Sequence, residues 1–101
     1  MMLPKVILDE IFNLKYQVSE SAIDHICDEI ETFGCVVDGC HNYDTSVIVY
    51  FSSEKKKLEG ELRVDRIEKH FEIAAKCGDE TILPIFGDWS LVVEYLNKIL
   101  L

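Results

Sequence analysis

The stretch Thr45–Asp65, TSVIVYFSSEKKKLEGELRVD, carries the clearest signal for the fold of this chain. Its first part, residues 45–52, is β-branched and apolar at consecutive positions, which favours a central strand covered on both faces. Residues 58–65 then alternate strictly between apolar or glycine positions and charged positions, as a half-exposed strand does. The polar residues 53–57 between the two runs indicate a turn, so we predict a β-hairpin.

The segments before this hairpin indicate helices. Residues 3–14 place their apolar side chains on one side of a short helix, although a strand over residues 6–8 is an alternative. Residues 20–33 have a clearer helical period, Ser19 or Ser21 can cap the start of this helix, and Gly34 can adopt the left-handed conformation that ends it. A short strand at residues 35–37 is expected to follow, with turns before residue 45.

The segments after the hairpin are predicted as a helix and a strand. Asp65 and Glu68 have the spacing of a capping box, which predicts a third helix between Asp65 and Gly78. Residues 81–86 form a short apolar run with Pro84 inside it. Because proline removes a backbone donor, this strand is expected at a sheet edge or at a bulge.

The predicted order of elements is α-α-β-β-β-α-β-α. Asp88 is expected to cap the last helix, whose apolar surface is wider than one stripe. We therefore predict an α+β (mixed α/β) fold in which a four-stranded sheet packs with about four helices. A chain of 101 residues is long enough for one core and too short for two, so residues 1–101 are expected to form a single domain. The wide C-terminal helix could be buried within the monomer or in a homodimer.

Charge is distributed unevenly along the chain. The formal net charge is −9, from 19 acidic and 10 basic side chains, and no lysine or arginine occurs between Lys15 and Lys55. A surface of this kind disfavours direct binding of nucleic acid or of an anionic membrane, because neutralising phosphates requires a basic footprint. A basic protein is the natural complement.

The N-terminal apolar run is interrupted by Asp9 and Glu10, too early for a signal peptide or a membrane span. We therefore expect a cytoplasmic protein. Its four cysteines are expected to be reduced and, for the most part, to be small core residues.

Four carboxylates on the predicted helix 20–33 are separated by steps of four, four and three residues, so they form one column facing away from the apolar stripe. Together with the loop after the helix they give the predicted partner-binding residues: Glu20, Asp24, Asp28, Glu31, Asp38, Tyr43 and Asp44. We expect a small acidic non-enzymatic binding protein, with an inhibitor, immunity or antitoxin-like role against a basic, nucleic-acid-handling partner. The same column also fits a solvated face that only aids solubility.

An enzymatic alternative comes from the predicted order of helix, three strands, helix and strand over residues 20–86. This order resembles the core of restriction-endonuclease-like nucleases. The resemblance implies a divalent-metal-dependent nuclease, with Asp44, Glu59 and Glu61 as ligands of Mg²⁺. The Glu-x-Lys pair of those enzymes is replaced by Glu61-Leu62-Arg63, and the same side chains fit a solvated strand face.

Other signals for chemistry are weak. The sequence has no glycine-rich phosphate loop, dinucleotide fingerprint or Ser/His/Asp set. Several cysteines and histidines lie near one another, but no Cys-x-x-Cys spacing occurs, and His25 and Cys27 point apart on their helix. His70, in the predicted third helix, is expected to be an ordinary, partly exposed histidine. We therefore expect no catalytic residue, no metal and no cofactor, and a non-enzymatic protein in preference to an enzyme.

Overall fold

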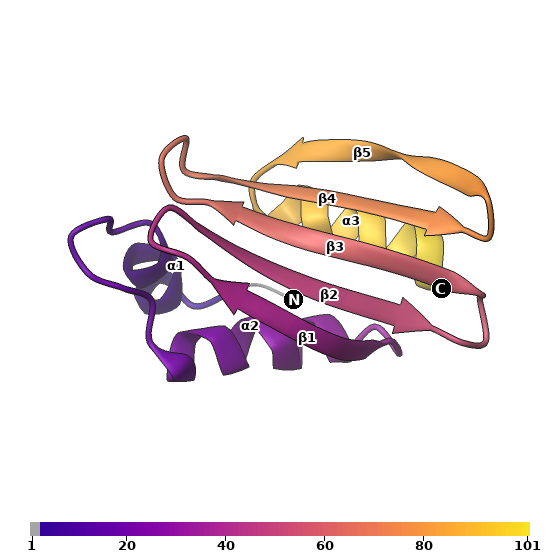
Figure 1. The fold of residues 1–101 in the computed structure, drawn as a ribbon, viewed down its shortest axis with the longest axis horizontal. Coiled ribbons are helices and arrows are strands. Elements are labelled where there is room, and N and C mark those ends of the chain that lie inside the picture. Colours follow the sequence, from indigo (N-terminus) through magenta and orange to yellow (C-terminus); the bar gives the residue numbers. More distant parts are fainter. Residues whose placement is uncertain (1–2) are drawn as a thin grey trace.

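The computed structural model describes residues 3–101, which form three helices on one face of a five-stranded antiparallel sheet (Figure 1). The helices are α1 (Lys5–Ile11), α2 (Glu20–Glu31) and α3 (Trp89–Leu100). The strands are β1 (Val36–Asn42), β2 (Ser46–Ser53), β3 (Leu58–Asp65), β4 (His70–Cys77) and β5 (Glu80–Gly87). Each strand pairs with the next one along the chain, in the order β1-β2-β3-β4-β5. The predicted α+β class is confirmed.

The main correction concerns β4, which replaces the helix predicted between Asp65 and Gly78. Phe71, Ile73 and Ala75 are buried, and the residues between them are more exposed, as in a strand with one covered face. Hydrogen bonding to β3 on one side and β5 on the other stabilises this strand and overrides the helical spacing of its apolar residues. The sheet therefore has five strands where four were predicted, and the described residues contain three helices where about four were predicted.

Asp65 closes the β3–β4 turn and does not start a helix. Its Oδ1 atom accepts hydrogen bonds from the backbone N–H groups of Ile67 (3.1 Å) and Glu68 (3.0 Å). Lys69 then adopts a left-handed φ of 59°, and the chain reverses into β4. Carboxylate-to-amide bonds of this type begin helices and also tighten turns, which is why the local pattern predicted a helix.

Several elements agree with the prediction. The Ser19 hydroxyl caps α2 by accepting a hydrogen bond from the N–H of Ala22 at 3.2 Å, and Gly34 follows the helix with a φ of 90°. Strand β3 has the predicted bounds, and Asp88 caps α3. Strand β5 lies at the sheet edge, and its pairing with β4 is irregular around Pro84, as expected for a proline in a strand.

Strand β1 is longer than predicted. The short strand expected at residues 35–37 continues to Asn42, and the turn residues Asp38 and Gly39 lie inside it. Pairing with β2 is irregular between Val37 and Gly39, so a bulge accommodates the residues that suggested a turn.

The core lies between the helices and one face of the sheet. Its strand residues alternate along β2, β3 and β4 and include Val47, Val49, Phe51, Leu62, Val64, Phe71 and Ile73. The other face of the sheet, here called the open face, is covered by no helix among residues 3–101 (Figure 1). Its half-buried side chains include Tyr50, Glu61, Arg63, Glu72 and Ala74. No helix of the described residues therefore covers the second face of residues 45–52, as the prediction required, although Ile48 on that face is buried.

Helix α3 packs on β4 and β5 of its own chain and buries Trp89, Val92 and Leu96. This accounts for much of its apolar surface within the monomer; a homodimer through this helix stays a prediction. None of the helices formed by residues 3–101 is long and apolar enough to cross a bilayer.

Arg66 is fully buried and joins distant segments through backbone carbonyl groups. Its Nε atom donates to the carbonyl of Ile11 at 2.8 Å, and Nη1 donates to the carbonyl of Asp44 at 2.6 Å. Nη2 donates to the carbonyls of Asn13 and Tyr16. The end of α1, the loop before α2 and the β1–β2 turn therefore meet around one guanidinium group.

Replacing Arg66 should destabilise the protein strongly. In Arg66→Met several buried carbonyls lose their donor, and we expect the free energy of unfolding to fall by about 3 kcal/mol or more. Arg66→Lys keeps the charge but has no planar fork of donors, so its loss should be intermediate. Urea denaturation measures both, with Lys76→Met as control. The Lys76–Glu59 pair is exposed, and its loss should cost less than about 0.5 kcal/mol. A similar loss in Arg66→Met and Lys76→Met would contradict this role.

Gly60 should be intolerant of a side chain, because a Cβ atom there would collide with the ring of Phe51 and lie 2.9 Å from the carbonyl oxygen of Ala74. We expect Gly60→Ala to lower the free energy of unfolding by about 1–3 kcal/mol, the usual cost of overpacking. Gly39→Ala is the matched control, since nothing lies within 4 Å of a Cβ atom at that position. Equal midpoints of thermal unfolding for the two variants would refute the close approach.

Candidate functional site

The predicted partner-binding residues come from α2, β1 and the β1–β2 turn, which are adjacent in the structure (Figure 1). At one end Asn42 Nδ2 donates a hydrogen bond to the carbonyl of Val18, just before α2, at 2.9 Å. At the other end the N–H of Val37 donates to Glu31 Oε2 at 3.5 Å. Helix and strand therefore run antiparallel, side by side.

All seven predicted residues are exposed. We call them the acidic surface: Glu20, Asp24, Asp28, Glu31, Asp38, Tyr43 and Asp44. Within residues 3–101, no lysine or arginine forms an ion pair with any of these carboxylates. Two cations of the later segment pair elsewhere, Arg63 with Glu72 and Lys76 with Glu59, each at 3.8 Å. The negative charge of the acidic surface is thus directed at solvent.

The β1–β2 turn is held in place at one edge of this surface. The Tyr43 ring stacks on the His41 imidazole with 5.6 Å between centroids, and the N–H of Tyr43 donates to the carbonyl of Ser46 at 2.8 Å. The carbonyl of Asp44 accepts a hydrogen bond from Arg66 while its side chain stays exposed. Tyr43 and Asp44 are therefore exposed on a turn that hydrogen bonds and ring stacking hold in place.

The residues of the nuclease alternative are not brought together. Asp44 precedes β2 at the end where Ser46 pairs with Asp65. Glu61 and Glu59 lie four and six residues from Asp65 along β3, which corresponds to roughly 13 and 20 Å at the usual rise of a strand. Such separations exceed what one metal ion can span. Since β4 also replaces the helix of the predicted order, the resemblance to the nuclease core is lost.

The cysteines differ in burial more than expected. All four thiols are free; Cys35 is buried and Cys27 half-buried, whereas Cys40 and Cys77 are exposed. Burial raises the pKa of Cys27 and of Cys35 to about 11, and the nearby negative charge of Glu31 adds to both shifts. The expectation of core cysteines therefore holds for Cys35 and in part for Cys27.

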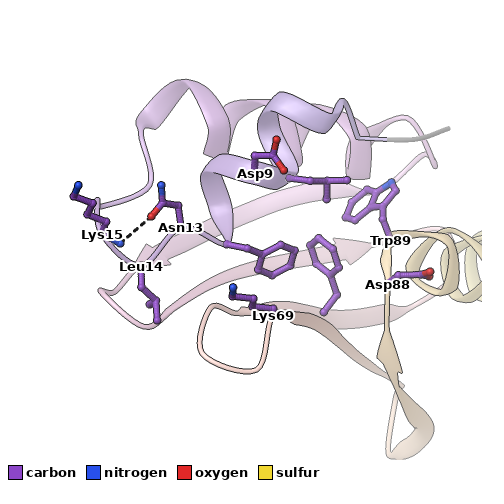
Figure 2. Close-up of a pocket in the computed structure, with 10 residues that line it drawn as sticks. Asp9, Asn13, Leu14, Lys15, Lys69, Asp88 and Trp89 are labelled. Carbon is purple, nitrogen blue, oxygen red and sulfur yellow. Dashed lines mark hydrogen bonds between the residues drawn. The ribbon is translucent and has the colours of Figure 1, made fainter.

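A pocket of about 730 Å³ lies away from the acidic surface, between α1, the loop after it, the β3–β4 turn and the start of α3 (Figure 2). Phe71 contacts Phe12 and Trp89 edge-to-face, with centroids 5.3 and 5.2 Å apart. Lys15, on the loop, and Lys69, on the turn, are also among the residues that line the pocket (Figure 2). The lining residues include no nucleophile paired with a base, so we assign no reaction to this pocket.

The four thiols should fall into two groups that differ in their rate of modification. With a pKa of about 11, only about one part in a thousand of Cys27 or Cys35 is thiolate at pH 8, and the thiolate is the reactive form. We expect iodoacetamide to modify Cys40 and Cys77 at least about tenfold faster than Cys27 and Cys35, as measured by peptide mass spectrometry. In urea the four rates should converge. Fast labelling of Cys35 in the folded protein would contradict its burial.

Comparison with protein-family models, with curated proteins and with solved structures found no match to this chain. The function is therefore argued from the geometry.

Proposed function

We propose that the protein is a small acidic non-enzymatic binding protein that engages a basic protein through the acidic surface. The observation that carries this proposal is the column Glu20, Asp24, Asp28 and Glu31 on α2, which is exposed and unpaired with lysine or arginine within residues 3–101. Like charges on one helix face repel one another, at a cost of a few tenths of a kcal/mol per pair. A cationic partner would relieve this repulsion.

The spacing of the column favours a partner that handles nucleic acid. Eleven residue steps of helix correspond to about 16 Å, so the four carboxylates present about one charge per 5 Å. One strand of DNA presents one phosphate about every 3.4 Å along its axis. The column could therefore occupy a cationic cleft built for a phosphate backbone, which fits an inhibitor, immunity or antitoxin-like role.

Exposed apolar groups on β1 and the β1–β2 turn would lengthen the lifetime of such a complex. Tyr43 is 52% exposed at the β1–β2 turn, and Val36 is 58% exposed at the start of the edge strand β1. Charged groups mainly accelerate association, whereas buried aromatic and apolar contacts mainly slow dissociation. We expect the carboxylates and these two side chains to act on different rate constants.

Charge reversal tests the proposal. The variant Asp24→Lys/Asp28→Lys/Glu31→Lys should fold, since these side chains are exposed, but associate with its partner at least about tenfold more slowly at low salt. The partner is first isolated by affinity capture from the native host at low and high salt, and stopped-flow kinetics then gives the association rate.

The matched control reverses three exposed carboxylates elsewhere in the chain, in Glu54→Lys/Asp79→Lys/Glu80→Lys, and so changes the net charge equally. It should retain most of the association rate, because only local charge at the contact surface steers docking strongly. Circular dichroism checks that both variants fold. Equal association rates for the two variants would refute the assignment of the acidic surface.

A further inference from the structure

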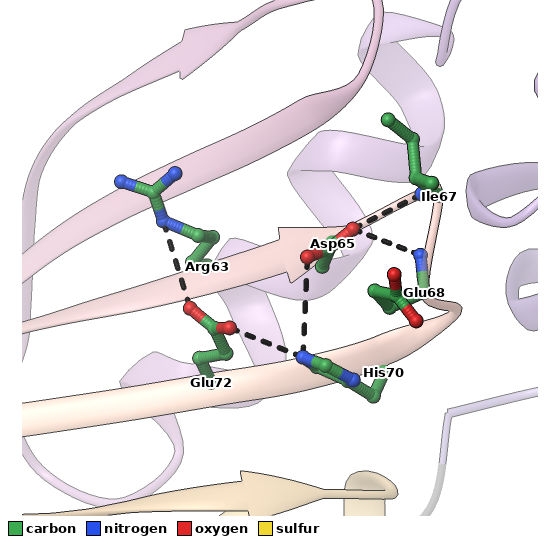
Figure 3. Close-up of polar contacts among 6 residues, drawn as sticks. All are labelled: Arg63, Asp65, Ile67, Glu68, His70 and Glu72. Carbon is green, nitrogen blue, oxygen red and sulfur yellow. Dashed lines mark hydrogen bonds and ion pairs between the residues drawn. The ribbon is translucent and has the colours of Figure 1, made fainter.

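Three side chains with metal-binding atoms converge on the open face of the sheet, at the β3–β4 hairpin (Figure 3). Asp65, the last residue of β3, pairs directly with His70, the first of β4, and Glu72 lies two residues further on the same face of β4. His70 Nε2 is 3.1 Å from Glu72 Oε1 and 4.0 Å from Asp65 Oδ2. One ligand atom from each residue lies within 4.8 Å of the other two.

The protein already holds these donors in position. Each carboxylate has one oxygen engaged elsewhere: Asp65 Oδ1 accepts the two N–H groups of the turn, and Glu72 Oε2 pairs with Arg63 Nε at 3.8 Å. The second oxygen of each carboxylate is the one near His70. The Phe86 ring packs edge-on against the imidazole, with centroids 6.1 Å apart. Supporting contacts of this kind raise metal affinity because the ligands lose little further freedom on binding.

We propose that Asp65, His70 and Glu72 bind a divalent ion of a first-row transition metal. One imidazole nitrogen and two carboxylate oxygens form a donor set that suits Mn²⁺, Fe²⁺ and Zn²⁺, and the two carboxylates balance the ionic charge. Metal–ligand bonds of about 2.0–2.2 Å place two ligand atoms at most about 4.4 Å apart. The two separations from His70 Nε2, 3.1 Å to Glu72 and 4.0 Å to Asp65, are within this limit. The upper limit of 4.8 Å on the separation of any two of the three ligand atoms exceeds it by only a few tenths of an ångström.

The site keeps room for further ligands. All three side chains are about 30% exposed, and no helix formed by residues 3–101 covers the open face. An ion held by three protein donors here would complete its coordination with water, as ions in open sites do. The cluster shares no residue with the acidic surface, so the inference does not depend on the proposed partner.

The first test locates the ion by NMR spectroscopy. Substoichiometric Mn²⁺ added to the ¹⁵N-labelled protein should broaden the amide signals of residues 65–72 before all others, because paramagnetic relaxation falls steeply with distance. Mn²⁺ is chosen because it prefers carboxylate and imidazole to thiolate ligands, which keeps the exposed cysteines out of the test. Broadening that begins at α2 would place the ion at the column of carboxylates and overturn the proposal.

The second test measures Zn²⁺ affinity by calorimetry. We expect one ion per chain and a loss of affinity of at least about tenfold in His70→Gln, in Glu72→Gln and in Asp65→Asn. Asparagine retains an oxygen that can accept the turn N–H groups, so Asp65→Asn should preserve the fold. The controls on the open face, His41→Gln and Glu61→Gln, should bind Zn²⁺ as the unmodified protein does.

Two further outcomes would overturn the proposed metal site. Zn²⁺ binding that survives His70→Gln but is lost in His41→Gln or Cys40→Ser would assign the ion to β1. Absence of binding by either ion at millimolar concentration would show that Asp65, His70 and Glu72 form only an ion-pair cluster.

Discussion

The buried guanidinium of Arg66 is the constraint on which the rest of the structure depends. A cation removed from water is costly unless its N–H groups find acceptors, and here the acceptors are carbonyl groups of α1, of the loop before α2 and of the β1–β2 turn. These segments must therefore meet where β3 turns into β4. Because Asp65 precedes Arg66 directly and Asp44 is one of its acceptors, the same residue positions one ligand of the proposed metal site and one edge of the acidic surface.

Carboxylates act in two different ways in this molecule. Those of the α2 column have no lysine or arginine partner among residues 3–101, and their field extends into solvent, where it acts over about a Debye length. Those of the hairpin cluster each have one oxygen held by the protein and one facing His70, so they act only within coordination distance. The first arrangement suits capture of a cationic surface, and the second suits a single ion. The first set lies on a helix that packs beside β1, and the second lies on the open face of the sheet.

The elements predicted correctly are those in which the spacing of the apolar residues agrees with the residues that begin and end a helix or strand. In α2 a helical apolar pattern lies between the Ser19 cap and Gly34, and in β3 strict alternation defines both bounds. The segment after Asp65 has two competing periods, because its apolar residues fit a helix and also alternate from Phe71 to Ala75. Because β4 pairs with β3 on one side and with β5 on the other, this segment forms a strand and its side chains alternate between the two faces of the sheet. His70, predicted to be an ordinary, partly exposed histidine on a helix, thereby lies opposite Asp65.

The amino-acid sequence alone determined local secondary structure and the distribution of charge. Helix caps, the spacing of apolar residues and a stretch without lysine or arginine involve only residues close along the chain, so they can be recognised without coordinates. The exposed column of α2 is a result of this kind. Contacts between distant residues were decided by the tertiary structure. Arg66 reaches a carbonyl 55 residues away, and Asp65, His70 and Glu72 face one another only because β3 and β4 pair in one register. The physical reason differs for the two: the Arg66 contacts require the chain to close long loops first, whereas Asp65 and His70, only five residues apart, meet because pairing of β4 with β3 and β5 favours a strand over a helix, and no local pattern of residues records either outcome.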